Sequence, residues 1–220
     1  MFWNLDPDAV YDFTFLRHGE STGNAEGYLQ GQTDFPLSET GILQVQALAQ
    51  RWQTLAKPFG LIISSPLQRA TQTAEILGAA LPAPLEFDPL WMERNNGRLA
   101  GLTGQQAQEK YPQPAFIPPY QKMGETGESQ WELYLRAGAA LDGLLKRPPG
   151  KYLIVSHGGL LNMALYAILG IPVQANFQGA SFRFRNTSFA RFRYIPNRHR
   201  WQFLSLNDHR HWPEFDNDNG

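Results

Sequence analysis

Two arginines and two histidines stand close behind short apolar runs of the sequence. They are Arg17, His18, Arg69 and His157. An arginine guanidinium offers planar pairs of N–H donors that match phosphate oxygens. A neutral histidine ring is a competent nucleophile toward phosphorus near pH 7. If these four side chains converge, they form a cationic pocket that suits a phosphoryl group.

Such a pocket also needs a proton donor for the departing alkoxide. A carboxylic acid beside the pocket can supply the proton, and Glu93 is the best-placed candidate. Gly19, Gly158 and Gly159 remove side chains where backbone N–H groups would approach an anion, and a helix is expected just after Gly159. These residues predict phosphoryl chemistry.

Three strand-like runs must bring the clusters together. The runs cover residues 11–16, 61–64 and 152–155, and each ends near one of the clusters. In a parallel sheet, ligands bind where the carboxyl ends of the strands meet. We therefore expect Arg17, Arg69 and His157 to face one another at that edge.

Helical periodicity separates these runs. Helices are expected over residues 38–56, 69–80, 129–147 and 160–169, with a short one over 103–111. Ser38 can cap the first of them. Its buried face is expected to hold Ile42, Val45, Leu48, Ala49 and Trp52. The alternation predicts an α/β layered domain with a largely parallel sheet.

The remaining segments are an excursion, a hairpin and a tail. Residues 82–127 are rich in Pro, Gly and Gln and read as a long excursion over the site. Alternating residues over 188–194 and 200–206, with a turn at 196–198, predict a C-terminal β-hairpin. Its exposed edge is a candidate contact for a homodimer. Residues 207–220 are expected to form a loosely held polar tail.

The composition excludes several classes of protein. The 220 residues carry 19 Lys+Arg and 20 Asp+Glu, and this near-neutral balance argues against nucleic acid or an anionic membrane as the main partner. The absence of cysteine rules out disulfides and thiolate chemistry. The first residues lack the basic and apolar regions of a signal peptide, so a cytoplasmic protein is the default expectation.

The ordered motifs resemble the histidine phosphatase superfamily, the group that includes the cofactor-dependent phosphoglycerate mutases. The stretches that carry the resemblance are Leu16-Arg17-His18-Gly19-Glu20-Ser21-Thr22-Gly23-Asn24, Pro36-Leu37-Ser38-Glu39-Thr40-Gly41, Ser64-Ser65-Pro66-Leu67-Gln68-Arg69, Glu93 with Gly97 and Gly101, and Ser156-His157-Gly158-Gly159. The resemblance covers residues 11–206. It implies one domain over 1–220, a three-layer α/β/α sandwich of the phosphoglycerate mutase type.

The resemblance also implies roles for the site residues. His18 would attack phosphorus and become transiently phosphorylated, and Glu93 would protonate the departing oxygen. Arg17, Arg69 and His157 would hold the phosphoryl oxygens. The same comparison adds three further residues to the phosphate pocket: Ser21, Asn24 and Gly158. The substrate would be a small phosphate ester, and neither a metal ion nor a cofactor would be needed.

Two activities remain open within this family. Glu93-Arg94 resembles the mutases, but Asn96 stands where they usually have an aromatic residue, Gly104 where they have Lys, and Gly159 where they have Asn. These departures remove groups that would hold a phosphoglycerate carboxylate. Hydrolysis of a phosphomonoester is therefore preferred, and mutase-type phosphoryl transfer is the alternative.

Other interpretations come from individual residues. Each site residue alone could serve as a strand cap, a core side chain or a solvated charge. The aromatic side chains Trp91, Trp131, Tyr120 and Phe116 could line a cavity or form a small core beneath the excursion. Arginines and aromatic residues alternate in the hairpin, which raises a non-catalytic phospho-ligand or RNA-binding module as an alternative from another class. Strict alternation instead favours one packed and one solvated face.

Overall fold

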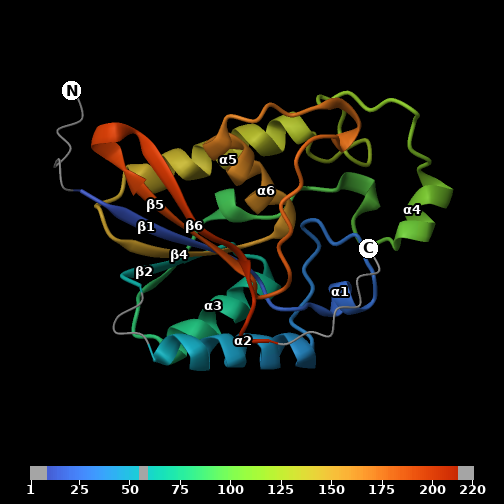
Figure 1. The fold of residues 1–220 in the computed structure, drawn as a ribbon. Coiled ribbons are helices and arrows are strands. Elements are labelled where there is room, and N and C mark those ends of the chain that lie inside the picture. The colour runs from blue at the N-terminus through green and yellow to red at the C-terminus, as the bar shows by residue number, and fades with distance from the viewer. Residues whose placement is uncertain (1–8, 55–58, 213–220) are drawn as a thin grey trace.

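The computed structural model describes residues 9–54 and 59–212, and in these residues six strands form one sheet in the order β3-β2-β4-β1-β5-β6 (Figure 1). The strands are β1 (Tyr11–Arg17), β2 (Leu61–Ser64), β3 (Leu85–Phe87), β4 (Lys151–Ser156), β5 (Phe189–Ile195) and β6 (Arg200–Asp208). Strands β3, β2, β4 and β1 are parallel, whereas β5 is antiparallel to β1 and to β6. The predicted largely parallel sheet and C-terminal hairpin are confirmed.

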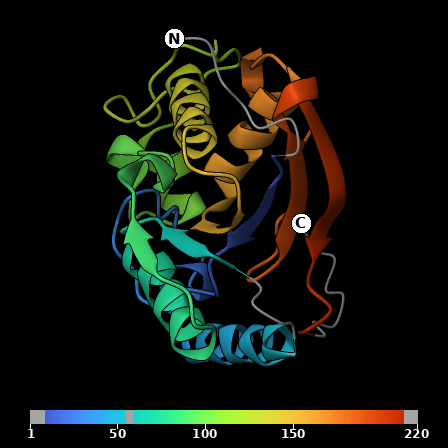
Figure 2. The same cartoon turned by 90° about the vertical axis from the view of Figure 1, so that its left-hand side faces the viewer.

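Helices cover both faces of this sheet (Figure 2). One layer contains α2 (Glu39–Gln53) and α3 (Gln68–Ala80), and the other contains α5 (Gln130–Leu145) and α6 (Gly158–Leu169). Two short helices, α1 (Thr22–Ala25) and α4 (Gly104–Lys110), lie beyond the sheet. The predicted three-layer α/β/α fold is therefore confirmed. No helix within residues 9–54 and 59–212 has the length and apolar character needed to cross a membrane.

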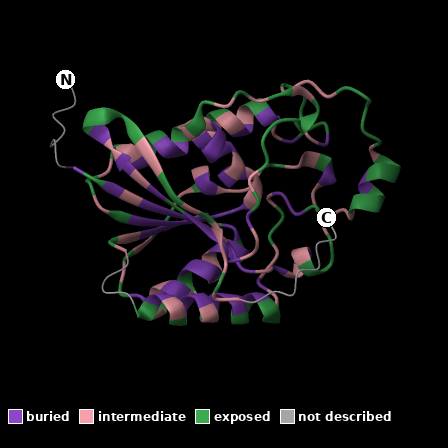
Figure 3. Ribbon diagram, viewed as in Figure 1, coloured by how far each residue is buried: buried purple, intermediate pink, exposed green. Residues whose placement is uncertain are grey.

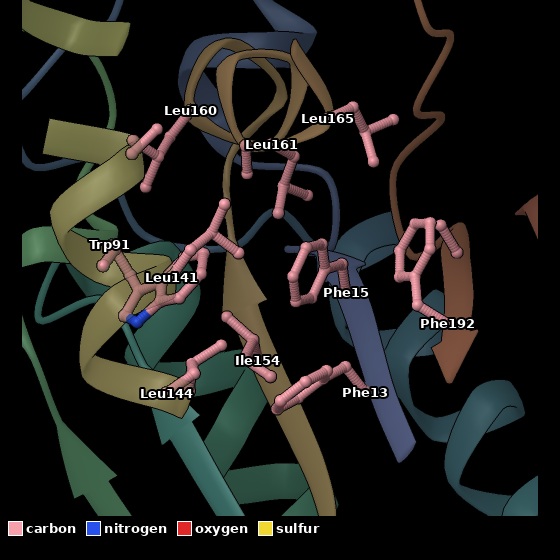
Figure 4. Packing of buried hydrophobic residues seen from close by; sticks show 14 of the residues in the cluster. Phe13, Phe15, Trp91, Leu141, Leu144, Ile154, Leu160, Leu161, Leu165 and Phe192 are labelled. Atoms are coloured by element: carbon pink, nitrogen blue, oxygen red, sulfur yellow. The ribbon is translucent and has the colours of Figure 1, made fainter. Parts of the chain in front are cut away.

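The sheet is buried because its side chains alternate between two apolar layers. Phe13 and Phe15 of β1 pack with Ile154 beneath α5 and α6, whereas Leu16 packs with the residues beneath α2 and α3. Figure 4 shows the first of these clusters, with Trp91 and Phe192 also in it. The central strands are buried along their length in Figure 3. A rigid sheet thus fixes the ends of β1 and β4, where His18 and His157 follow.

Helix α2 begins where the sequence predicts. Ser38 Oγ accepts the Gly41 N–H at 3.0 Å, as an N-cap should. The expectation that Ile42 is buried is wrong: it is 38 % exposed, because it lies at the edge of the apolar stripe. Gln44 is buried instead, and its Oε1 accepts the Glu20 N–H at 2.9 Å. The predicted extension over residues 55–56 lies outside the described residues.

Close backbone contacts within the excursion and two hydrogen bonds to Leu29 hold the excursion in place. Gly97, Gly124 and Gly127 approach so closely that a Cβ on Gly97 would overlap backbone atoms of the other two. The Leu29 N–H donates to Leu102 O at 2.8 Å, and the Gly101 N–H donates to Leu29 O at 3.0 Å. The excursion, green in Figure 1, is thereby held beside residues 28–31 at the carboxyl edge of the sheet.

The expectation of a loose tail from residue 207 onward is wrong for its described part. Strand β6 continues to Asp208, whose carboxylate accepts two hydrogen bonds from Arg51, at 2.8 and 2.9 Å. These bonds hold the pKa of Asp208 well below its usual range. His211 Nε2 lies 2.9 Å from Thr187 Oγ1, and its ring stacks on Phe189. Residues 213–220 lie outside the described residues.

Candidate active site

A pocket of about 250 Å³ lies at the carboxyl ends of β1 and β4. Five of the predicted site residues line it, namely Arg17, His18, Asn24, Arg69 and Glu93. Gln30, Gly31, Arg94, Asn96 and Gly159 contribute the rest of the wall together with Tyr28 and Leu29. Residues as far apart as 17 and 159 in the chain therefore meet at one edge of the sheet, as parallel topology requires.

The ring of His18 is fixed by the backbone that follows it. Its Nδ1 lies 2.6 Å from Gly19 O, and since a carbonyl only accepts, Nδ1 carries the proton. Nε2 is left with a lone pair. Burial, followed by the cations of Arg69 and Arg17, holds the pKa of His18 well below 6.5. The neutral, nucleophilic form is therefore the resting form.

His157 lies beside His18, with the two ring centroids 4.9 Å apart. His157 Nε2 lies 2.8 Å from Ser65 Oγ, which also accepts the Leu67 N–H at 3.3 Å. The Ser65 hydroxyl proton can thus go to His157 Nε2, so that Nδ1 carries the ring proton. This buried Nδ1 has no hydrogen-bond partner among the described residues. The ring is therefore a hydrogen-bond donor available next to the His18 nucleophile.

Two buried histidines and a half-buried one should make stability depend on pH. Burial lowers the pKa of His18 and of His157 well below 6.5, and it lowers that of His211 to about 4. Below pH 6.5 the unfolded chain binds protons that the folded protein does not. The free energy of unfolding should therefore fall as the pH drops from 7 to 5, by up to about 1.4 kcal/mol per histidine per pH unit.

Urea unfolding across this pH range measures the effect. His211→Phe, which removes one of the three groups, should reduce the slope by roughly one third. A free energy of unfolding that is the same at pH 5 and pH 7 would show that these rings take up protons equally readily in both states.

Arg69 supplies a buried guanidinium. It is 1 % exposed, and its Nη atoms donate to Gly31 O at 2.7 Å and to Thr33 O at 3.1 Å. Burial lowers its pKa to about 10, against the opposing charges of Glu93 and Asp34, so it stays cationic. Its buried Nε has no partner among the described residues.

Arg17 is anchored by a 2.7 Å hydrogen bond that its Nη1 donates to Phe184 O. Backbone carbonyl groups thus orient both guanidinium groups at the pocket, which prepares it for an anion.

Glu93 is held by the backbone of the loop and of α6. Its Oε1 accepts the N–H groups of Arg94 and Leu160, at 2.8 and 3.2 Å, and its Oε2 accepts that of Gly159 at 3.0 Å. The N-terminal end of α6 therefore binds the Glu93 carboxylate. The sequence instead predicts that this end of the helix faces the substrate anion. These bonds fix Glu93 in the wall of the pocket.

Gly159 and Gly158 provide a matched pair of variants. A Cβ on Gly159 would overlap Glu93 Oε1, whereas a Cβ on Gly158 would meet only Arg17 Nε at 4.0 Å, an ordinary contact. Alanine is favourable within a helix. Gly159→Ala should therefore displace Glu93 and lower kcat by about 10- to 1,000-fold, since a 1 Å displacement alone can cost 10²-fold.

Gly158→Ala should keep kcat within about threefold of the wild type because ordinary packing suffices at that position. Steady-state kinetics with circular dichroism as a folding control decide the comparison. Equal losses in the two variants would mean that the position of Glu93 does not control the reaction.

Asn24 and Ser21 form the first turn after the His18 motif. Asn24 Oδ1 accepts the Ser21 N–H at 3.2 Å, which leaves the NH₂ group of that amide to bind an anion at the pocket. Ser21 is fully buried, and its Oγ caps α1 and lies 2.7 Å from Gln30 Oε1. Neither Ser21 nor Gly158 lines the pocket. Ser21 supports the loop behind the wall, and contact of either residue with phosphate stays a prediction.

Several residues that hold the site were not predicted from the sequence. Asn186 Nδ2 donates to His18 O at 3.1 Å, and the Thr187 N–H lies within 3.2 Å of the same oxygen. Arg136 of α5 donates to the carbonyls of Leu90, Met92 and Glu93 and pairs with Glu128 at 2.7 Å. No local sequence pattern indicates these contacts of Arg136 with the loop carbonyls.

The four aromatic residues of the excursion region do not line this pocket. Trp91 is fully buried in the main core, and Ser156 Oγ donates to its carbonyl oxygen at 2.8 Å. Phe116 and Tyr120 are 63 % and 68 % exposed, and Trp131 packs against Tyr120. Across residues 9–54 and 59–212, no three His, Asp or Glu side chains gather closely enough to hold a metal ion.

The sequence and the fold of this chain are similar to those of the same group of known proteins. The model of the histidine phosphatase superfamily (branch 1) matches residues 13–209. The "Probable phosphoglycerate mutase GpmB" of Yersinia pestis (strain Pestoides F) is 38 % identical over 190 residues, which are 81 % of this chain and 83 % of that protein.

Two solved structures illustrate the similarity of fold. The mycobacterial glucosyl-3-phosphoglycerate phosphatase, solved as a complex with VO3, has a TM-score of 0.75 and 27 % identity over 90 % of this chain and 99 % of that one. The Bacillus stearothermophilus protein YhfR has a TM-score of 0.77 at 23 % identity, over 90 % of this chain and 97 % of that one.

Proposed function

This chain belongs to the histidine phosphatase superfamily (branch 1), and on that premise we propose that it hydrolyses a small phosphomonoester through a phosphohistidine intermediate. The observation that carries the proposal is the state of His18. Its Nδ1 proton is bound to Gly19 O, which leaves Nε2 with a lone pair, and the residue lines the pocket together with Arg17 and Arg69. A neutral imidazole next to two cations is arranged to attack phosphorus.

In the first step, His18 Nε2 forms a bond to phosphorus as the bond from phosphorus to the ester oxygen breaks. The ring becomes positive, and Gly19 O stabilises it through the Nδ1 proton. Arg17, Arg69 and His157 offset the charge that spreads over the phosphoryl oxygens. Glu93 gives its proton to the departing oxygen, so the product is a neutral alcohol.

In the second step, water attacks the phosphorus atom of phosphohistidine. The Glu93 carboxylate accepts a proton from this water, the bond from phosphorus to Nε2 breaks, and inorganic phosphate leaves. His18 returns to its neutral form. The charges on the pocket wall come from arginine side chains, so we expect the cycle to need no metal ion.

A panel of phosphorylated metabolites and simple phosphate esters, assayed for released phosphate in the presence of a chelator, tests the proposal. We expect at least one ester to be turned over at full rate in EDTA. Failure to release phosphate from any ester, or complete dependence on an added metal, would contradict it.

Mutase-type phosphoryl transfer is the second candidate, and two observations favour it. The relative from Yersinia pestis carries a mutase name. Arg94 also lines the phosphate pocket, where a guanidinium could bind a substrate carboxylate. Incubation with 3-phosphoglycerate and a bisphosphorylated primer decides between them, because a mutase forms 2-phosphoglycerate whereas a phosphatase releases inorganic phosphate and glycerate.

A further inference from the structure

A second cavity, of about 320 Å³, adjoins the phosphate pocket. Leu29, Arg94 and Asn96 line both, so the two spaces are neighbours. The walls of the second cavity are mainly apolar and include Leu99, Ala107, Ile117, Met123 and Phe177. Its size falls in the range of sites that bind small organic molecules.

This cavity is separate from the cores that hold the fold together. Leu29, Ala107 and Phe177 belong to neither of the two buried clusters that flank the sheet. Leu29 and Phe177 are 36 % and 43 % exposed, although both are large apolar side chains next to a charged pocket. Apolar surface beside an anion site favours a ligand with one charged end and one apolar end.

The wall formed by Phe177 is held in place at some conformational cost. Asn176 and Phe177 both have positive φ, 55° and 52°, a region that non-glycine residues rarely adopt. Two hydrogen bonds maintain this turn: the Asn176 N–H donates to Ile117 O at 2.8 Å, and the Ile117 N–H donates to Asn176 Oδ1 at 2.7 Å. The loop between α6 and β5 is thereby fastened to the excursion.

Arg94 connects the two spaces. Its guanidinium carbon lies 5.4 Å from the centroid of the Phe177 ring, and its Nε donates to Asn96 Oδ1 at 3.2 Å. The cation therefore stacks on the ring at the boundary, with the phosphate pocket on one side and the apolar walls on the other.

We propose that this second cavity binds the alcohol portion of the substrate, and that the enzyme prefers phosphomonoesters whose alcohol carries an aromatic or compact apolar group. The proposal rests on the proposed phosphatase function. Phe177, Leu29 and Ala107 are then specificity residues, because they contact the part of the substrate that does not react. Small, fully polar alcohols such as glycerate would leave these walls in contact with water.

Two matched esters test the preference in catalysis. Propyl phosphate and 3-phenylpropyl phosphate are both esters of primary alkanols, so their leaving groups differ little in acidity. We expect kcat/KM to be about 10- to 100-fold higher for the phenylpropyl ester, which is the range that burial of an apolar group supplies.

Two variants connect the preference to the cavity. Phe177→Ala removes a wall, and Ala107→Phe fills the space, so each should reduce the ratio of the two kcat/KM values by at least about fivefold. Phe116→Ala is the matched control, since Phe116 lies on the same excursion, is 63 % exposed and lines neither cavity. It should leave the ratio unchanged.

Binding of non-hydrolysable analogues separates this inference from the proposed function. Calorimetry should show 4-phenylbutylphosphonate binding at least about tenfold more tightly than butylphosphonate. Equal affinities would overturn the inference, and the phosphatase proposal would still stand if both esters were hydrolysed. A tenfold binding preference that Phe177→Ala removes, with no hydrolysis of either ester, would support the cavity and contradict the phosphatase.

Discussion

His18→Ala should lower kcat for phosphate-ester hydrolysis by at least about 10⁴-fold, to the level of the assay background. The reason is that the variant lacks the side chain that forms a covalent bond to phosphorus in the proposed mechanism, and removal of a nucleophile typically costs about four to six orders of magnitude. The arginines remain in the variant. Substrate binding should therefore survive, and a phosphonate analogue should bind within about tenfold of the wild-type affinity.

His199→Ala is the control for this experiment, because His199 is exposed in the turn between β5 and β6 and does not line the pocket. It should retain full activity. Steady-state turnover and calorimetry on both variants make the comparison. Substantial turnover by His18→Ala, above about one hundredth of the wild-type rate, would require another nucleophile and a different mechanism.

Glu93→Gln should produce the second largest loss, about 10²- to 10⁴-fold in kcat for alkyl phosphates, the range that general acid–base catalysis contributes. An amide has no proton to give to an alkoxide. Its NH₂ group would also face one of the backbone N–H donors that now bind the carboxylate, such as that of Gly159. Both effects act on the departure of the alcohol.

The dependence on the leaving group distinguishes proton donation from a purely structural role. The bond to p-nitrophenol breaks without protonation, so phosphorylation by p-nitrophenyl phosphate should be much less impaired than phosphorylation by propyl phosphate. Rapid-mixing kinetics should show a burst of nitrophenol followed by slow turnover. Glu125→Gln, on the exposed part of the excursion, is the control. Equal losses for both esters in the burst phase would contradict the acid role of Glu93.

The elements that build the sheet were predictable because they obey local rules. Strand β1 alternates Phe13 and Phe15 with residues that face the other layer, and Ser38 caps α2 with a side chain three residues from its partner. Strand β3 was missed, since it has three residues, of which two are exposed, and offers no alternating pattern. It forms because β2 provides an unpaired edge, which is a property of the assembled sheet.

The site was predictable in its residue types but not in its connections. Motifs identified Arg17, His18, Arg69 and His157, which follow strands or begin helices. The contacts of Asn186 with His18 and of Phe184 with Arg17 join residues more than 160 positions apart. No local pattern encodes such contacts.

The contacts that position Glu93 and the contacts of Asp208 could not be predicted for the same reason. Glu93 is positioned by backbone N–H groups of α6. Almost every residue has such a donor, so the residue type does not reveal the contact. The polar composition after residue 206 predicted a loose segment, yet Asp208 meets Arg51 across 157 positions. Polar residues there are ordered by partners that only the fold supplies.

Rapid quenching of the enzyme during turnover of a ³²P-labelled phosphomonoester, followed by peptide mapping, tests the central claim most directly. The account predicts an acid-labile, alkali-stable phosphoryl group on Nε2 of His18, formed and lost at rates that match turnover. Turnover without labelled enzyme, or a phosphoryl group on any other residue, would contradict it.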